Sequence, residues 1–449
     1  MLGVRLNRLI SVFIVSGLLL STSVSQTKLQ PKRKTKNFGS SLKRMKWDER
    51  KNETVLVPAT RHTSGDADLD VVRIETSLVA WDVLVVDSQG NNVQGLTAQD
   101  FQVSEDGALQ TIGHFLLGSN QEVPRTIVLI IDYSGSQLPY IRNSIDSAKV
   151  LVDSLAPLDR MAIVTDDVDL LLDFTNDKKL LKEKLEMLAD RDKRGGFFGL
   201  GKERRLGKSQ QYSALMATLN EMFDESDQRP IVVFQTDGDE VYRLRDSIIP
   251  PQLPPDLPPD TRQMFEQYLT HRQQSRILDQ TVFTLADVYR TAEKSRATIY
   301  TVVPGFRLIG LSPDVQLQRV REKIENSREA LWAKYSPEER AKLKAEQDEK
   351  WRPLSPVNLR AKAAELYKVQ LALAAIAPRT GGWTDFLETP EQASSIYSRI
   401  FSDINKRYIV GYYPTNKAHD GTRRQIKIEV KGHPEYTLIG RRSYYAPSN

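Results

Sequence analysis

The spacing of apolar residues changes near residue 125, and the change separates two kinds of predicted structure. From Asp70 to about Phe115, short alternating apolar runs are broken by turn residues such as Asp106-Gly107, a pattern typical of strands joined by tight turns. It predicts a small β-sandwich, of immunoglobulin-like or related type, over residues 70–118. Thr126–Ile131 is instead a continuous run rich in β-branched residues, which predicts a strand buried on both faces of a parallel sheet.

Helical and strand-like segments alternate from this run to about residue 406. The predicted helices include Ile141–Leu155, Lys178–Leu188, Tyr212–Phe223 and Leu285–Lys294, and the predicted strands include Met161–Val164, Leu170–Phe174, Ile231–Gln235 and Thr298–Val303. Such alternation favours a doubly wound, mostly parallel α/β domain, which we place at residues 124–406.

Two insertions interrupt the predicted α/β domain. One, at about residues 240–280, is Pro-rich and then helical, and its three Pro-Pro pairs between Pro250 and Asp260 predict an extended surface segment, either a rigid spacer or a peptide-docking ligand. The other, at residues 308–362, is rich in Glu, Lys, Arg and Ala and predicts a charged helical arm. Within it, Ser336-Pro337-Glu338-Glu339 has the N-cap, the proline and the acidic residue of a helix start.

The last part of the chain, residues 407–449, predicts a C-terminal β segment. Apolar stretches at Tyr408–Tyr413, Gln425–Val430 and Tyr436–Arg441 have the length and alternation of strands. These strands either extend the N-terminal sandwich or form a small sheet of their own.

Residues 1–25 have the layout of a secretory signal peptide. Arg5 and Arg8 precede an apolar run from Leu9 to Leu20, and Ser23-Val24-Ser25 offers small residues for cleavage. An uncleaved membrane anchor is the alternative, but the run is shorter than the roughly 20 residues that span a bilayer. We therefore expect an exported protein of the periplasm, the cell surface or the extracellular medium.

Composition narrows the chemistry that such an exported chain can use. The sequence has no cysteine, which excludes disulfides, thiolate catalysis, zinc ribbons and iron–sulfur clusters. Its net charge of +5 comes mostly from basic residues after the signal, and residues 26–69 are predicted to be a basic disordered linker. This linker either contacts an anionic envelope surface or is merely solvated, and no nucleic-acid partner is expected.

Polar residues directly follow the first buried strand, in the order Asp132-Tyr133-Ser134-Gly135-Ser136. In a doubly wound sheet, ligands bind in the crevice beyond the carboxyl ends of the strands. A carboxylate and two hydroxyls at alternate positions of a tight loop offer the oxygen atoms that Mg²⁺ and similar hard cations require. The loop is thus a candidate divalent-cation site.

Two later segments add oxygen atoms at the same predicted edge. Ser213 begins a predicted helix, and Asp237 follows the predicted strand Ile231–Gln235, so a third hydroxyl and a second carboxylate are expected to converge on the loop. A serine-rich turn that only caps the next helix would explain the loop, but it would not explain Ser213 and Asp237. The predicted metal ligands are Asp132, Ser134, Ser136, Ser213 and Asp237.

This set resembles the metal-ion-dependent adhesion site of von Willebrand factor A-type (VWA) domains, whose pattern is Asp-x-Ser-x-Ser followed by a distant Thr and a distant Asp. Ser213-Ala214-Leu215 matches the Thr-Ala-Leu of that family, with serine in place of threonine. The flanking stretches Leu96–Gly107 and Tyr408–Pro414, and the terminal Arg441–Pro447, are similar to those of exported VWA-related proteins described from acidobacteria. The resemblance covers residues 70–240 and 295–447.

In that family the cation has an open coordination position that an acidic residue of the partner completes. The resemblance therefore implies an adhesion-type binding module, not an enzyme, whose partner is a protein or peptide that presents a carboxylate. Mg²⁺ is the expected ion, with Mn²⁺ or Ca²⁺ as alternatives. Arg204 and Arg205 lie in a Gly-rich, basic loop before Ser213 and would favour an acidic partner, unless the loop is a plain connection.

Three other interpretations stay open. A structural envelope protein would carry the metal site incidentally, and a metal-dependent hydrolase would use the same ion as a Lewis acid. The five histidines include no HExxH spacing, and the sequence has no Gly-x-Ser-x-Gly elbow and no P-loop, which disfavours the hydrolase. The acidic group Asp166, Asp167 and Asp169 is a weaker candidate for a second cation, such as Ca²⁺.

Overall fold

The computed structural model describes residues 37–58, 78–119, 123–134, 137, 140–190, 209–224, 229–245, 280–332, 336–339, 355–389 and 391–447. Contacts divide the chain into residues 1–34 and residues 35–449, and all described residues belong to the second unit. The predicted signal peptide, the Pro-Pro pairs, the loop with Arg204 and Arg205, and Ser136 lie outside the described residues. Within the described ranges, no helix is both long and apolar enough to cross a bilayer.

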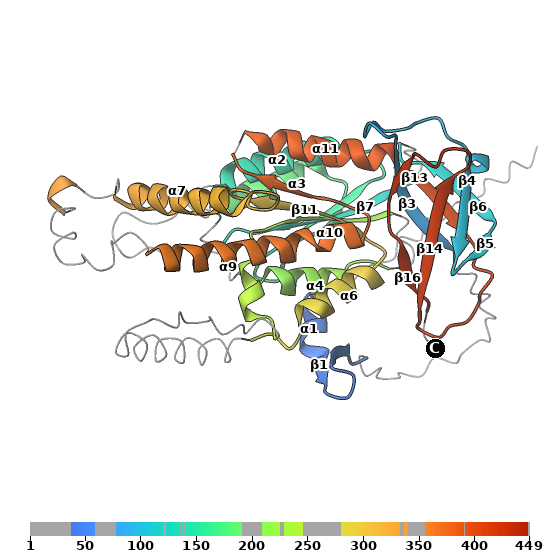
Figure 1. Cartoon of the computed structure of the whole chain (residues 1–449), viewed down its shortest axis with the longest axis horizontal. Helices are drawn as coiled ribbons and strands as arrows, with labels where there is room; N and C mark the ends of the chain where they lie inside the picture. The colour runs from blue at the N-terminus through green and yellow to red at the C-terminus, as the bar shows by residue number, and fades with distance from the viewer. Residues whose placement is uncertain are drawn as a thin grey trace, which may run out of the picture. The chain divides into compact units, whose positions relative to one another are not determined.

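Among the described residues, a six-stranded sheet forms the centre of the α/β domain (Figure 1). Its strands are β7 (Arg125–Ile131), β8 (Arg160–Thr165), β9 (Asp169–Thr175), β10 (Arg229–Gln235), β11 (Thr298–Pro304) and β12 (Thr384–Leu387). They lie in the order β12-β11-β10-β7-β8-β9, and every pairing is parallel except that of β9 with β8. This is the strand order 3-2-1-4-5-6 of doubly wound folds, so the predicted fold class is confirmed.

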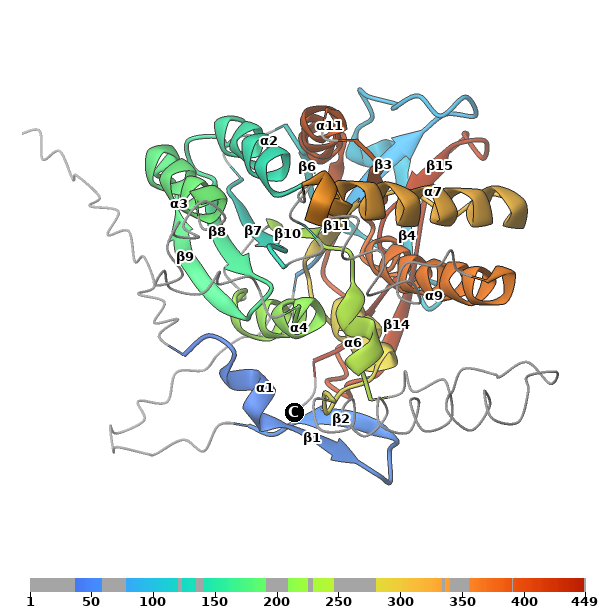
Figure 2. The same ribbon diagram turned by 90° about the vertical axis from the view of Figure 1, so that its left-hand side faces the viewer.

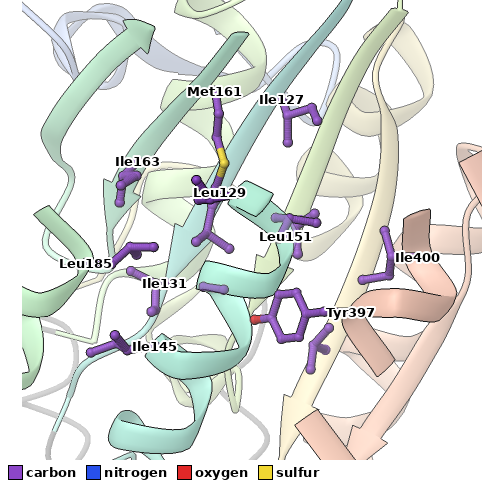
Figure 3. Close-up of a cluster of buried hydrophobic side chains, with 14 of the residues drawn as sticks. Ile127, Leu129, Ile131, Ile145, Leu151, Met161, Ile163, Leu185, Tyr397 and Ile400 are labelled. Carbon is purple, nitrogen blue, oxygen red and sulfur yellow. The ribbon is translucent and has the colours of Figure 1, made fainter. Parts of the chain in front are cut away.

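Helices cover both faces of this sheet, because alternate residues of each strand point to opposite sides. One face carries α2 (Ile141–Asp153), α3 (Lys178–Asp190) and α11 (Gln392–Lys406), and the other carries α4 (Gln211–Glu221), α6 (Leu285–Lys294) and α10 (Ile376–Arg379). Figure 3 shows Ile127, Leu129 and Ile131 of β7 packed against the first set of helices. Val128 and Ile130 pack against the second set, which explains the continuous apolar run in the sequence.

Eight described strands form a β-sandwich next to the α/β domain. Four precede that domain, namely β3 (Val79–Val86), β4 (Phe101–Glu105), β5 (Ala108–Gln110) and β6 (Ile112–Leu117), and four follow it, namely β13 (Tyr408–Tyr412), β14 (Arg423–Val430), β15 (Thr437–Ile439) and β16 (Ser443–Tyr445). They form two sheets, of order β15-β3-β13-β6 and β16-β14-β4-β5. The C-terminal strands therefore extend the N-terminal sandwich, which decides between the two predicted possibilities.

Residues 37–58 are folded, although the sequence predicted a disordered linker over residues 26–69. They form α1 (Ser40–Arg44) and a hairpin of β1 (Met45–Asp48) and β2 (Glu53–Leu56). Met45 is buried in the core that includes α4, and a Glu221 carboxylate oxygen accepts a hydrogen bond from Gly39 N at 3.0 Å. The prediction was wrong here because a segment with few apolar residues can still fold when an existing core receives them.

The predicted charged arm contains two long helices, α7 (Pro313–Trp332) and α9 (Pro356–Ala374), which we call the arm. Figures 1 and 2 show them side by side, and Figure 1 shows that they extend from the end of the sheet farther from the sandwich. Leu308, Val320, Leu359 and Ala363 form a buried cluster that packs the two helices together. The predicted capping box at Ser336 is present, because Ser336 Oγ accepts from Glu339 N at 3.3 Å and Glu339 Oε2 accepts from Ser336 N at 2.8 Å.

A buried arginine joins the sandwich to the amino end of β10. Arg229 begins this strand, is almost fully buried, and donates to Gly118 O at 2.8 Å and to Ile404 O at 3.0 Å. Its Nε lies 3.7 Å from Asp82 Oδ2 of β3. Gly118 is required at this junction, because a Cβ there would lie 2.4 Å from Ile404 O.

The amino end of β7 has an arginine in the paired position. Arg125 is opposite Arg229 in the register of the two strands. Its Nε donates to Asp159 Oδ2 at 2.8 Å, and its Nη1 donates to Asn405 Oδ1 at 2.6 Å. Both side chains of the Arg125–Asp159 pair are buried, so the charges of Arg125 and Arg229 each have an acidic partner.

Candidate metal centre

The candidate site lies where the strand order reverses, between β7 and β10. These strands are adjacent and parallel, and Ile131 pairs with Gln235 at their last residues. Asp132 follows β7 and Asp237 follows β10 after one residue. Doubly wound sheets bind their ligands in the crevice at this reversal. The structure thus places both predicted carboxylates at one edge of the sheet, which we call the carboxyl edge.

Asp132 is only 1% exposed, and its carboxylate accepts hydrogen bonds from three elements. Its Oδ1 accepts from Ser134 N at 3.0 Å. Its Oδ2 accepts from Thr236 Oγ1 at 3.1 Å and from Gln211 Nε2 at 3.0 Å. The loop after β7, the loop after β10 and the start of α4 are therefore joined through this one side chain.

Asp237 is held in turn by the loop that follows β7. Gln137 Nε2 donates to Asp237 Oδ2 at 2.7 Å, and Asp239 N donates to Asp237 Oδ1 at 3.3 Å. Gln137 is only 2% exposed, and its Oε1 is buried without a hydrogen-bond partner among the residues that the structure describes. A buried acceptor that lacks a partner costs free energy, and a cation next to it would satisfy it.

Ser213 lies in the first turn of α4 and is connected to Asp132 through a short network. Its Oγ donates to Glu240 Oε1 at 2.5 Å and its N donates to Glu240 Oε2 at 2.9 Å. Gln211, two residues earlier, contacts Asp132, and Gln211 Oε1 accepts from Glu240 N at 3.2 Å. In the described geometry, the α4 side chain that contacts Asp132 is thus Gln211, and Ser213 lies beside it.

The remaining two predicted ligands belong to the loop after β7. Ser134 is buried next to Asp132, whereas Ser136 lies outside the described residues and its role stays a prediction. Sequence reasoning missed four residues of this site, namely Gln137, Gln211, Thr236 and Glu240. Their positions in the sequence could have indicated them. Each is a polar residue that follows a buried strand or begins the helix that was predicted to lie at this edge.

Several acidic side chains gather at the carboxyl edge, and we call Asp132, Asp166, Asp237, Asp239 and Glu240 the carboxylate cluster. Burial raises the pKa of Asp132 well above its usual range, and the charges of Asp237 and Asp166 add to this shift. Burial also raises the pKa of Asp166 to about 6 and that of Glu240 to about 7. Ionising these buried carboxyl groups therefore costs more free energy than ionising an exposed one.

This chemistry fits a hard divalent cation. The groups next to Asp132 and Asp237 include carboxylate, hydroxyl and amide oxygens, which Mg²⁺, Mn²⁺ and Ca²⁺ accept as ligands. A nearby positive charge would also offset the cost of ionising buried carboxylates. In the part of the chain that the structure describes, no three histidine, aspartate or glutamate side chains could hold a metal by themselves. A cation held here would therefore need neutral oxygen atoms, such as those of Ser134 and Gln137, as further ligands.

The second acidic group is engaged in holding loops. Asp166 Oδ1 accepts from Tyr133 N at 3.2 Å, and Asp166 Oδ2 accepts from Ser209 N at 2.9 Å. Asp167 Oδ2 accepts from Tyr133 Oη at 2.6 Å. These bonds fix the loop after β7 against the segment that enters α4, and a second cation at this group stays a prediction.

Comparisons with known proteins give structural neighbours only. No family model matches the chain, and no curated protein matches it. The similar solved structures include three N-terminal domains of the type V pili tip protein Mfa5 from Porphyromonas gingivalis, at 17% identity over 36% of this chain and with a TM-score of 0.22. This chain spans only 26% of that one.

Two further neighbours cover more of the chain. The von Willebrand factor type A protein from Catenulispora acidiphila is 11% identical, with 84% of this chain and 75% of that chain covered and a TM-score of 0.33. Manganese-loaded TRAP protein from Plasmodium vivax is 10% identical, with 78% and 100% covered and a TM-score of 0.27. Similarity at this level indicates no function, and the fold class of this chain, an α/β domain with a mostly parallel sheet, follows from its own strand order.

Proposed function

We propose that this chain is an exported, metal-dependent binding module that engages a carboxylate of a protein or peptide partner. One observation carries the proposal. Asp132 and Asp237 come from adjacent strands, meet at the reversal of strand order, and are surrounded by hydroxyl and amide groups. Among the described residues, neither carboxylate forms a salt bridge comparable to those of Arg125 and Arg229.

The proposed ligands of the cation are Asp132, Ser134, Ser136, Ser213 and Asp237, with Mg²⁺ as the expected ion. A bound divalent cation would supply a coordination position for a carboxylate oxygen of the partner. Thr236 and Gln211 orient the carboxylate of Asp132 through their hydrogen bonds. Gln137 orients that of Asp237 and adds an amide oxygen to the same edge.

Binding is favoured over catalysis by the groups at the site. Of the five histidines, the three that the structure describes are His114 of β6 and His419 and His433, which flank β14. None of these three belongs to the carboxyl edge, so the described site has no imidazole base for Ser134. Export rests on the sequence pattern of residues 1–25, and the periplasm, the cell surface and the medium are all compatible with it.

The proposal is tested by titrating the full chain with Mn²⁺ and Mg²⁺ in a calorimeter. We expect Asp132→Asn and Asp237→Asn each to weaken the affinity for Mn²⁺ by about 10- to 100-fold or more. Asp314→Asn is the matched control, because Asp314 is an exposed aspartate of α7. Circular dichroism verifies that the variants are folded. If the wild type and both site variants bind Mn²⁺ with equal affinity, the proposed metal centre is wrong.

Carboxylate recognition needs a second measurement. The probe is a fluorescein-labelled Gly-Ser peptide with one glutamate, compared by anisotropy with the same peptide carrying glutamine. We expect the glutamate peptide to bind more tightly in Mg²⁺ and to lose this advantage when a chelator is added. If the two peptides bind equally while Mn²⁺ binds normally, the metal site stands but the proposed recognition of a carboxylate is wrong.

A further inference from the structure

The arm begins and ends next to the candidate site. β11 lies beside β10 in the sheet, and the chain leaves β11 through Gly305 and Phe306 to enter α7. The base of the arm is fixed to this exit, because Gln370 of α9 donates to Phe306 O at 2.8 Å and accepts from Leu308 N at 2.8 Å. The position of the two helices relative to the carboxyl edge is thus set by buried polar contacts and not only by the connecting loops.

Side chains of the arm reach the loops that form the site. Gly238 follows Asp237 and has a φ of +74°, and a Cβ at this residue would lie 2.6 Å from Leu373 Cδ1 of α9. On the other helix, Lys323 Nζ lies 3.8 Å from the position of a Cβ on Gly305 and 5.0 Å from the centroid of the Phe306 ring. One helix therefore covers the loop of Asp237, and the other carries an ammonium group to the end of the next strand.

The ammonium group of Lys323 lies within the electrostatic range of Asp237. The chain packed around it lowers the pKa of Lys323, and the Asp237 carboxylate acts in the opposite direction, although the side chain as a whole is exposed. Within the described residues, Lys323 has a cation–π contact with Phe306 and no salt bridge. A cation that is exposed, unpaired and next to an acidic site is available for a negatively charged ligand.

A basic group such as Lys323 would improve the charge balance at the carboxyl edge when an acidic partner binds. The carboxylate cluster contains five acidic side chains, and one divalent cation offsets only part of their charge when they are ionised. An acidic partner that approached the cation would meet repulsion from the remaining carboxylates. A basic side chain at the rim reduces this repulsion and, in addition, selects partners that carry more than one negative charge.

We propose that Lys323 forms a second contact with the partner, an ion pair with a carboxylate that neighbours the one bound at the carboxyl edge. This inference rests on the proposed function and specifies the partner further: an acidic peptide segment with at least two adjacent carboxylates, bound between the metal centre and the arm. The arm is then part of the binding face, and its α7 helix carries the residue that distinguishes a doubly acidic segment from a single acidic residue.

The test compares two fluorescein-labelled Gly-Ser peptides, one with a single glutamate and one with two adjacent glutamates, by anisotropy with the full chain in Mg²⁺. We expect the wild type to bind the two-glutamate peptide about fivefold more tightly, as one solvent-exposed ion pair allows. Lys323→Gln should remove this preference, because it should weaken the binding of the two-glutamate peptide about fivefold more than that of the one-glutamate peptide. Lys323→Arg should retain the preference.

Arg321→Gln is the matched control. Arg321 is an exposed basic residue of the same helix, about 200° around the axis from Lys323, and its loss should leave the preference in place. A preference that survives Lys323→Gln overturns the inference. So does a wild type that binds both peptides equally while Mn²⁺ binds normally. The inference is also overturned if Lys323→Gln weakens both peptides by the same factor as it weakens Mn²⁺. Lys323 would then act on metal binding alone. Failure of the wild type to bind Mn²⁺ removes the proposed function itself.

Discussion

The amino and carboxyl ends of β7 and β10 carry opposite charges, and the two ends differ in how these charges are neutralised. β7 begins with Arg125 and is followed by Asp132, and β10 begins with Arg229 and is followed within two residues by Asp237. At the amino end, each arginine lies next to an aspartate of another element. At the carboxyl end, the carboxylates lie next to one another, and burial together with the charges of Asp237 and Asp166 raises the pKa of Asp132. Paired buried charges hold the fold together, whereas a buried group of like charges points to a functional site.

The largest effect is expected at the amino end. Arg125→Met should leave Asp159 as a buried carboxylate without its partner, and such a loss destabilises proteins by about 3 to 5 kcal/mol. Urea unfolding followed by circular dichroism measures the change. Arg142→Met is the control, because Arg142 is 51% exposed and pairs with Glu186 on the surface. Its loss should cost no more than about 1 kcal/mol. Equal effects of the two variants would break the comparison between the two ends.

A smaller effect is expected from pH at the carboxyl end. Burial raises the pKa of Glu240 from an ordinary 4.5 to about 7, so the folded chain holds this proton more tightly than the unfolded chain. The stabilisation is fully present below about pH 4.5 and is lost as the pH rises through about 7. The loss is on the order of 3 kcal/mol. Urea unfolding in the presence of a chelator, at pH 5 and at pH 7.5, should show it.

Glu240→Gln isolates this contribution. Glutamine keeps an oxygen that accepts from Ser213 and cannot ionise, so the variant should lose the part of the pH dependence that falls between about 4.5 and 7. An unchanged pH profile in this variant would mean that other members of the carboxylate cluster dominate.

The smallest effect is expected at Gln137, and it tests whether this residue belongs to the metal centre. Gln137→Glu places another carboxylate where the amide oxygen of Gln137 is buried without a partner. We expect Mn²⁺ to bind roughly fivefold more tightly, because one added charge at close range contributes about 1 kcal/mol even in water. Gln137→Met, which removes the amide, should weaken binding instead. Calorimetric titration compares both with the wild type, and identical affinities would place Gln137 outside the metal centre.

The sequence predicted the fold well where burial leaves a regular pattern. Thr126–Ile131 and Ile231–Gln235 are apolar without interruption because helices cover both faces of their sheet. The two carboxylates were predicted from their position after these strands, and the structure places them at one edge. Residues 37–58 escaped prediction, because their stability comes from contacts with α4 and α6 that are distant in sequence.

The details of the candidate site were less accessible. Ser213 has the spacing expected of a ligand, yet Gln211 contacts Asp132 in the described geometry. A difference of two residues at the start of α4 depends on where the helix begins, and sequence patterns leave helix ends uncertain by that amount. The unpartnered oxygen of Gln137 follows from packing alone, which no spacing rule reveals.

The sandwich is built from strands on both sides of the α/β domain, and this has a mechanical consequence. The chain enters and leaves the α/β domain at one place, where Gly118 N donates to Arg407 O at 2.6 Å. A partner that pulled on the carboxyl edge would therefore draw β7 and β10 along their own length against the junction with the sandwich, where Arg229 also donates to Gly118 O and Ile404 O. Force applied in this direction loads all the hydrogen bonds of a strand together, in shear, and resists rupture far better than peeling them apart one by one.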